Sequence, residues 1–195
     1  MADFRCCRTA WLCRSRTYTL CILGNTAQTA LLGMFAYWGP KATTYMFHLP
    51  PGHADILFGG VTVLAGIAGT LAGGLLLDAL GGSEPGAALV CLVATAASFA
   101  LLQAAFRLCY TLAPFVVVFA VGQFALFMLQ SPVTRIILLS VPPEQRPLAF
   151  GIQTIAIHVL GDVPSPPLAG WLHDAAFSAD DVVRPAPAFM PVLQS

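Results

Sequence analysis

The sequence predicts an all-α fold: a polytopic membrane helix bundle with five transmembrane helices. Three observations lead to this prediction. Five apolar stretches are each long enough to cross a bilayer at about 1.5 Å per residue. The composition is 57% hydrophobic and only 9% charged, with a mean hydropathy of +0.79, whereas a soluble domain carries roughly 25% charged residues. Each stretch also far exceeds the roughly 9 to 11 residues of a membrane β-strand.

The first predicted span covers residues 17–38 and follows a basic segment, residues 1–16, that contains four arginines. By the positive-inside rule this segment is cytoplasmic. An apolar run of about 22 residues exceeds the roughly 7 to 15 of a signal-peptide core, so we expect the span to be retained. Asn25, Gln28 and Thr29 lie on one side at its middle. Each is costly in lipid unless it faces protein or a water-filled cavity, so this side is expected to face inward.

The second and third spans are expected to have different surroundings. In the second, residues 56–77, Ala65, Gly69 and Gly73 recur at four-residue spacing, which favours close approach of another helix. That approach is either static packing or a contact that slides during a functional cycle. The third span, residues 87–106, offers few polar side chains and is expected to face lipid.

The fourth span, residues 112–139, carries a polar stripe. Gln123, Gln130 and Thr134 stand at positions i, i+7 and i+11, which share one face of a regular helix. We expect that face to line a cavity. Arg135 follows near the predicted cytoplasmic end, where it either extends its charge to the interface or binds an anionic group.

The fifth span, residues 148–172, holds the sharpest polar constellation. Thr154, His158 and Asp162 recur every four residues. Histidine changes charge near neutral pH, and a carboxylate one turn away stabilises its charged form, so His158 and Asp162 are candidates for proton coupling. Three plainer interpretations stay open: a hydrogen bond that only holds the pair, a helix-capping role beside the nearby prolines, or an exposed Asp162 at the interface. A proline-containing tail, residues 175–195, follows.

A short repeat suggests internal symmetry. Gly74 and Asp78 end the second span as Gly-x-x-x-Asp, and Gly170 and Asp174 end the fifth in the same way. The two spans are three helices apart, so the aspartates are expected on opposite sides of the membrane. An inverted three-helix repeat predicts this arrangement, and chance is the alternative. Such a repeat also implies a sixth helix beyond these five spans, and it is compatible with a preceding half.

Several segments together resemble the Spinster-like transporters of the major facilitator superfamily. The resemblance covers residues 15–174, and its strongest part is similar to the family's eleventh helix region. The matching residues are Arg146-Pro147-Leu148, Gln153, His158, Gly161-Asp162, Ser165-Pro166 and Gly170, preceded by Phe58-Gly59-Gly60-Val61-Thr62 and Leu89-Val90-Cys91.

This resemblance implies that the chain is a partial major-facilitator C-terminal half, with its spans corresponding to helices seven to eleven of a twelve-helix carrier. Gly74, Asp78 and Gly81 look like the second copy of the superfamily's loop motif, in which the aspartate latches one conformation. The basic residues that usually accompany the motif are absent here, which weakens the case for an ionic latch. Arg146, in the other predicted cytoplasmic loop, joins these three as a gating candidate.

The resemblance further implies a secondary carrier that exports a lipid such as a sphingolipid or lysophospholipid, with proton coupling, from endosomal, lysosomal or plasma membranes. The chain lacks the first six helices of such a carrier, so a truncated, non-transporting protein that assembles with partners is the alternative. An intramembrane enzyme is disfavoured because no nucleophile motif accompanies His158 and Asp162. No metal, cofactor or nucleic-acid partner is expected. The residues expected to line the substrate path are Asn25, Gln28, Thr29, Gln123, Gln130, Thr134, Arg135 and Thr154.

Overall fold

The structure is a computed structural model that describes residues 15–177. The predicted N-terminal segment, residues 1–16, and the predicted tail, residues 175–195, lie almost wholly outside this range. Within it the secondary structure is helical throughout, and five helices are long and apolar enough to cross a membrane. The predicted all-α membrane bundle is therefore confirmed.

Helix α2 (Arg16–Phe47) extends well beyond the predicted end of the first span. It begins after Ser15, whose hydroxyl accepts a hydrogen bond from the Tyr18 amide at 3.4 Å, a usual N-terminal cap. Pro40 lies inside the helix without ending it. The hydroxyls of Thr43 and Thr44 donate to the Pro40 carbonyl at 2.9 and 3.0 Å, which adds polar support just past the proline.

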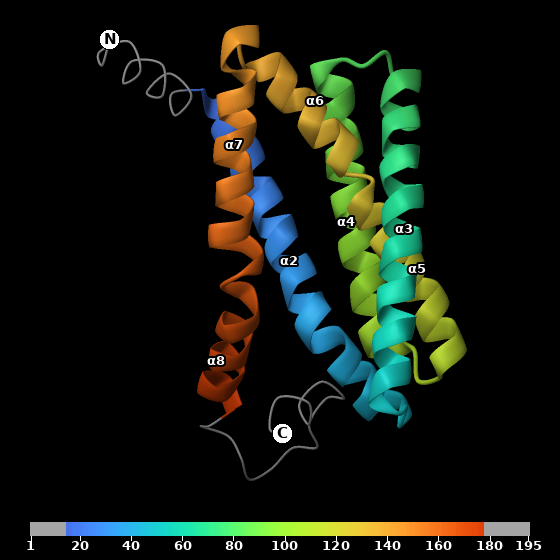
Figure 1. Ribbon diagram of the computed structural model, residues 1–195. Coiled ribbons are helices and arrows are strands. Elements are labelled where there is room, and N and C mark those ends of the chain that lie inside the picture. Colours follow the sequence, from blue (N-terminus) through green and yellow to red (C-terminus); the bar gives the residue numbers. More distant parts are fainter. Residues whose placement is uncertain (1–14, 178–195) are drawn as a thin grey trace.

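Helices α3 (Pro51–Ala79) and α4 (Glu84–Leu108) are joined by a tight turn. Gly81 and Gly82 adopt φ values of +77° and +60° there, a left-handed conformation that glycine reaches without strain. The turn fixes α3 and α4 as antiparallel neighbours (Figure 1).

The fourth span is interrupted at its middle. Helix α5 (Leu112–Phe127) ends two residues before α6 (Gln130–Ser140) begins. Pro132 explains part of this break, because it has no amide hydrogen to donate to the Met128 carbonyl. The Leu126 carbonyl at the break instead accepts a hydrogen bond from Gln28 Nε2 on α2 at 2.8 Å.

The fifth span is also irregular. A short 3₁₀ turn, η1 (Pro143–Gln145), leads into α7 (Arg146–Ala156), a π-helical turn η2 (Ile157–Asp162), and α8 (Ser165–Phe177). The Val163 amide donates to the His158 carbonyl at 3.2 Å, the five-residue spacing of a π-helix. Prolines at 164, 166 and 167 follow at once. Such widened turns occur frequently at functional sites.

Two groups of helices form the bundle (Figure 1). Helices α3, α4, α5 and α6 lie together on one side, while α7 and α8 continue one another on the other. Helix α2 runs obliquely between them, beside α7 at one end and near the start of α3 at the other (Figure 1). It packs on η2, α3, α6 and α8, so it joins the two groups.

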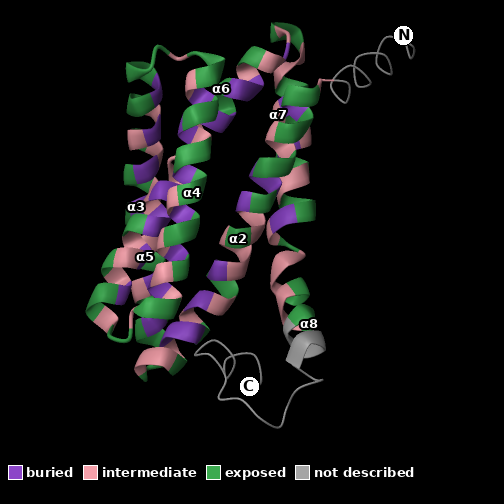
Figure 2. Ribbon diagram, turned by 180° about the vertical axis from the view of Figure 1, so that it is seen from behind, coloured by how far each residue is buried: buried purple, intermediate pink, exposed green. Residues whose placement is uncertain are grey.

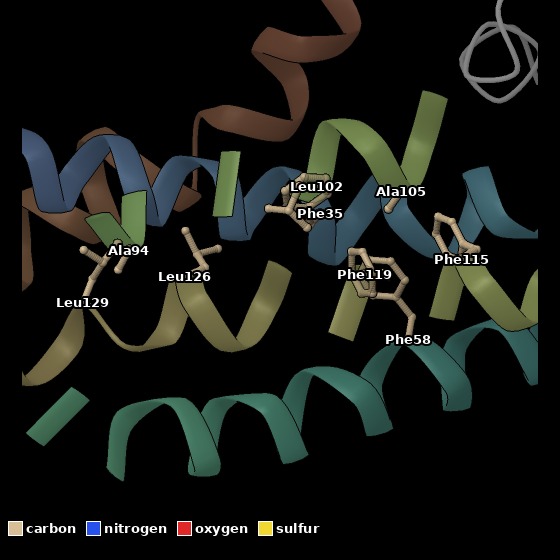
Figure 3. Packing of buried hydrophobic residues seen from close by; sticks show 9 residues of the cluster. All are labelled: Phe35, Phe58, Ala94, Leu102, Ala105, Phe115, Phe119, Leu126 and Leu129. Atoms are coloured by element: carbon tan, nitrogen blue, oxygen red, sulfur yellow. The ribbon is translucent and has the colours of Figure 1, made fainter. Parts of the chain in front are cut away.

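An aromatic cluster fixes α2, α3 and α5 near their shared end (Figure 3). The Phe58 and Phe119 rings lie 4.5 Å apart between centroids, and Phe115 and Phe119 are stacked at 5.6 Å. Phe35 on α2 meets Phe119 edge to face at 6.2 Å. Because such rings bury large apolar areas in specific geometries, this end of the bundle is firmly packed.

Helix α4 corrects the expectation that the third span faces lipid. Its exposed side carries Leu92 and Phe99, but a continuous stripe on its other side is buried against α5 and α6 (Figure 2). Small residues make this stripe possible, because they admit close packing without any polar signature in the sequence. The buried residues are Ala87, Val90, Ala94, Ser98, Leu102 and Ala105.

Candidate functional site

A cavity of about 470 Å³ lies between α2, α3 and α5, and we call it the central cavity. Its walls are largely aromatic and aliphatic, with Phe35, Phe58 and Phe127 among them. Gln123 on α5 is only 1% exposed and lines this cavity. Its side-chain oxygen has no hydrogen-bond partner in the described part of the chain. A buried amide without a partner is costly, so this group is available to a water or a ligand.

Two further polar residues line the central cavity and were not among the candidates from the sequence. Thr62 lies on the α3 face that meets α5, and its buried hydroxyl also lacks a partner among the described residues. Asp55 lies two turns earlier on α3 and is exposed. The seven-residue spacing between them was the available signal, because it puts both on one face of a helix.

The polar residues of α2 lie outside both cavities. Gln28 is buried and satisfies the Leu126 carbonyl at the α5–α6 break. Asn25 is buried too, while the Thr29 hydroxyl donates to the Asn25 carbonyl in its own helix at 2.9 Å. None of the three lines either cavity described here. This polar side of α2 faces protein, as predicted, and Gln28 supports the neighbouring helix.

A second cavity, of about 340 Å³, lies between α3 and the α5–α6 span, near the α3–α4 turn. It brings together Gln130, Thr134 and Arg135 with Gly74 and Asp78 of the loop motif. The break between α5 and α6 thus divides the predicted stripe, because Gln123 lines the central cavity and the others line this one.

Arg135 uses its charge to hold the α3–α4 turn. Its Nε atom donates to the Gly82 carbonyl at 3.0 Å, and its side chain is exposed. Asp78 lines the same cavity but forms no ion pair with Arg135. Arg135 on α6 thus contacts this turn through the Gly82 carbonyl and not through Asp78. Arg146 lies at the start of α7, outside the lining of this cavity.

The π-helical turn presents the His158 and Asp162 pair. His158 Nδ1 lies 3.0 Å from Asp162 Oδ2, and the two side chains are 56% and 32% exposed. The Asp162 carbonyl also accepts from the Ser165 hydroxyl at 3.0 Å. Thr154 is exposed, and its hydroxyl donates to the Phe150 carbonyl at 2.9 Å, so it stands apart from the pair.

Glycine lets α2 approach this turn closely. A Cβ atom added at Gly33 would lie 2.7 Å from both the Cα and the carbonyl oxygen of Asp162. One added at Gly161 would lie 3.0 Å from the Thr26 carbonyl. The Asp162 backbone therefore packs directly against α2. A change in the conformation of the π-helical turn would shift its contact with that helix.

The predicted small-residue contact lies between α3 and α5. A Cβ at Gly69 would collide with the Phe124 carbonyl, and one at Gly73 with the Met128 carbonyl. The Ser131 hydroxyl donates to the Thr70 carbonyl at 3.0 Å across the same contact.

Comparison with known proteins assigns the chain to a family. A sequence model of the Organic Anion Transporter Polypeptide (OATP) family matches residues 6–110 and 104–176. The chain belongs to this transporter family. Members of the family are transporters and not enzymes, so the chain is an integral, multi-pass membrane protein of a transporter class.

Curated relatives are Spinster proteins, as the resemblance predicted. The chain is 42% identical over 161 residues to "Probable sphingolipid transporter spinster homolog 2" of Arabidopsis thaliana, which covers 82% of the chain and 32% of the relative. It is 31% identical to "Protein spinster" of Drosophila melanogaster, over 84% of the chain and 29% of the relative. It is 30% identical to "Protein spinster homolog 1" of Homo sapiens, over 84% of the chain and 34% of the relative. The chain therefore spans about a third of the length of these relatives.

Proposed function

We propose that this chain forms part of a secondary carrier that moves an amphipathic lipid across a membrane by alternating access. Membership of a transporter family supports this, as does the similarity to a protein named as a probable sphingolipid transporter. The observation that carries the proposal is the central cavity, where Thr62 and Gln123 are polar groups without partners in the described chain, among aromatic walls.

The central cavity suits a molecule that is part polar and part apolar. At about 470 Å³ it falls within the roughly 300–1,000 Å³ of ordinary small-molecule sites. Phe35, Phe58 and Phe127 offer an apolar wall to a hydrocarbon chain. Gln123 and Thr62 can form hydrogen bonds with a polar headgroup, which a purely apolar ligand cannot do.

Alternating access needs two bundles that rock about a shared site. We therefore infer that these helices correspond to the seventh to eleventh of a twelve-helix carrier, and that the remaining helices come from a longer protein. On the same resemblance, the α3–α4 turn and the α6–α7 connection face the cytoplasm. Endosomal, lysosomal or plasma membrane is the proposed location. The alternative is a non-transporting membrane protein that acts through its partners.

The direct test is lipid export from vesicles. The protein, expressed from its full-length transcript, is reconstituted into liposomes loaded with labelled sphingosine 1-phosphate or lysophosphatidylcholine. We expect release of at least one lipid to exceed that from protein-free vesicles. The chain reconstituted alone serves as the comparison, because a single bundle is not expected to transport. Equal release from all vesicles contradicts the proposal and favours the partner-assembly alternative.

We further propose that Asp162 and His158 couple transport to protons. The support is their 3.0 Å contact and the close approach of the Asp162 backbone to Gly33, since protonation changes the charge of a side chain whose backbone packs directly on α2. Asp162→Asn is expected to abolish the pH dependence of transport while leaving expression and membrane insertion intact. Glu84→Gln, an exposed acid at the start of α4, is the matched control. A pH profile that is unchanged in Asp162→Asn removes this role.

A further inference from the structure

The central cavity carries a single negative charge from the described residues. Asp55 is the sole ionisable side chain among them that lines it, and its carboxylate makes no ion pair with any of them. Lys41 follows the lining residue Pro40 in the sequence. Lys41, however, holds its Nζ atom 4.2 Å from the centre of the Tyr37 ring and 4.9 Å from that of Trp38. That cation is thus already engaged with aromatic faces outside the cavity lining.

The polar groups are spaced along the cavity. Asp55 and Thr62 are seven residues apart on α3, or about 10 Å along the helix axis at 1.5 Å per residue. The Phe58 ring occupies the position between them and belongs to the aromatic cluster. Asp55 lies within the second turn of α3, near the end of the bundle, and Gln123 lies deep in α5. The cavity thus has a carboxylate at its outer end, an apolar middle, and a neutral amide and hydroxyl further in.

This arrangement selects by charge. An anionic headgroup placed beside Asp55 meets a like charge, and no cation among the described residues lines the cavity to compensate it. A cationic headgroup gains a charge-assisted contact at the same place. The buried side chain of Gln123 is independent support that a ligand or water is accommodated, because it is 1% exposed and its oxygen has no partner in the described chain.

We propose that the central cavity binds a cationic amphiphile, with its ammonium group against Asp55 and its apolar body along Phe35 and Phe58. The proposal deepens the proposed function and rests on it only in placing this cavity on a transport path. It differs from the expectation raised by the family's description, which names organic anions. The binding preference itself follows from the cavity's own side chains.

Matched headgroups on one hydrocarbon tail provide the test. Dodecylamine, dodecanol and dodecanoate are cationic, neutral and anionic at neutral pH and share the same chain. Equilibrium binding of each is measured to the purified protein, expressed from its full-length transcript, in neutral-lipid nanodiscs. We expect the amine to bind about tenfold more tightly than the alcohol, which corresponds to about 1.4 kcal/mol, and the carboxylate to bind more weakly than both.

Variants assign the preference to one residue. Asp55→Asn is expected to remove most of the amine's advantage, Asp55→Glu to retain it, and the distant Glu84→Gln to leave it unchanged. Melting curves check that each variant is folded. No preference for the amine, or a preference that survives Asp55→Asn, overturns the inference.

The two proposals fail separately. Asp55-dependent binding of the amine without export of any lipid from vesicles contradicts the proposed transport and leaves the cavity's selectivity standing. Lipid export together with headgroup binding that does not depend on Asp55 supports the proposed transport and contradicts the proposed selectivity of the cavity.

Discussion

Two helix contacts in this molecule both depend on glycine, yet they differ in chemistry. At the α3–α5 contact, Gly69 and Gly73 bring α3 against the backbone of Phe124 and Met128. At the contact between α2 and the π-helical turn, Gly33 and Gly161 bring α2 against the backbone near Asp162. The first joins two helices of one group and contains no ionisable side chain. The second joins the two groups and includes the His158–Asp162 pair.

This difference suggests that the α3–α5 contact is part of a static scaffold, and that the contact of α2 with the π-helical turn takes part in the proposed mechanism. Close packing of backbone on backbone has few alternative arrangements, so α3 and α5 are expected to keep their positions. A π-helical turn carries an extra residue and loosely constrained carbonyls, and it lies beside a titratable pair. The same small residues therefore serve static packing in one place and a polar, adjustable contact in the other.

The largest effect is expected from a substitution that disrupts the α3–α5 contact. Gly73→Ala pushes a Cβ atom into the Met128 carbonyl and is expected to destabilise the bundle by about 1–3 kcal/mol, the usual cost of overpacking. Gly60→Ala in the same helix meets nothing within 4 Å, so it is expected to stabilise by roughly 0.5–1 kcal/mol through helix propensity. Thermal melting in detergent measures both. The melting temperature is expected to fall for Gly73→Ala and to rise for Gly60→Ala. Equal changes in melting temperature would contradict a special α3–α5 contact.

A smaller loss is expected at the polar contact. Gly33→Ala places its Cβ 2.7 Å from the Asp162 backbone, but the π-helical turn can adjust, so the cost is expected at the low end, about 1 kcal/mol. Gly24→Ala, with open space in the same helix, is the control. The melting temperature is expected to fall less for Gly33→Ala than for Gly73→Ala. A larger fall at Gly33 reverses the assignment of scaffold and adjustable contact.

The smallest effect concerns the break between α5 and α6. Gln28→Leu removes the hydrogen bond to the Leu126 carbonyl and is expected to cost about 0.6–1 kcal/mol, since membrane-buried side-chain bonds contribute little individually. Gln103→Leu on α4 is the matched substitution, because no hydrogen bond involves that side chain in the described chain. Melting curves that do not distinguish the two variants show that the bond does not support the break.

Local sequence was enough to predict the five spans, because length and hydropathy act on each segment separately. The inward side of Asn25 and Gln28 was predictable for the same reason, since buried polar groups must face protein. The contact made by the α3 glycines was also predictable, because small residues at four-residue spacing allow another helix to approach closely.

Other features depend on neighbours and had no local signature. The break at Met128 and Leu129 needs both Pro132 and a donor from α2, so the sequence of one helix does not reveal it. The buried side of α4 consists largely of alanine, which suits lipid and protein equally. For Asp55 the sequence offered only its seven-residue spacing from Thr62, and this face of α3 lines a cavity because α2 and α5 close around it.

The central claim is that α3 turns one face to a water-accessible cavity and its other faces to lipid or protein. Gly59 and Gly60 test this directly, because a Cβ atom meets nothing within 4 Å at either position, yet only Gly59 lines the central cavity. Each is changed to cysteine, and labelling by a membrane-impermeant thiol reagent is measured in vesicles against the parent chain. Labelling of Gly59→Cys well above that of Gly60→Cys is the predicted result. Equal labelling, or none above the parent at Gly59→Cys, contradicts the existence of the cavity in the membrane.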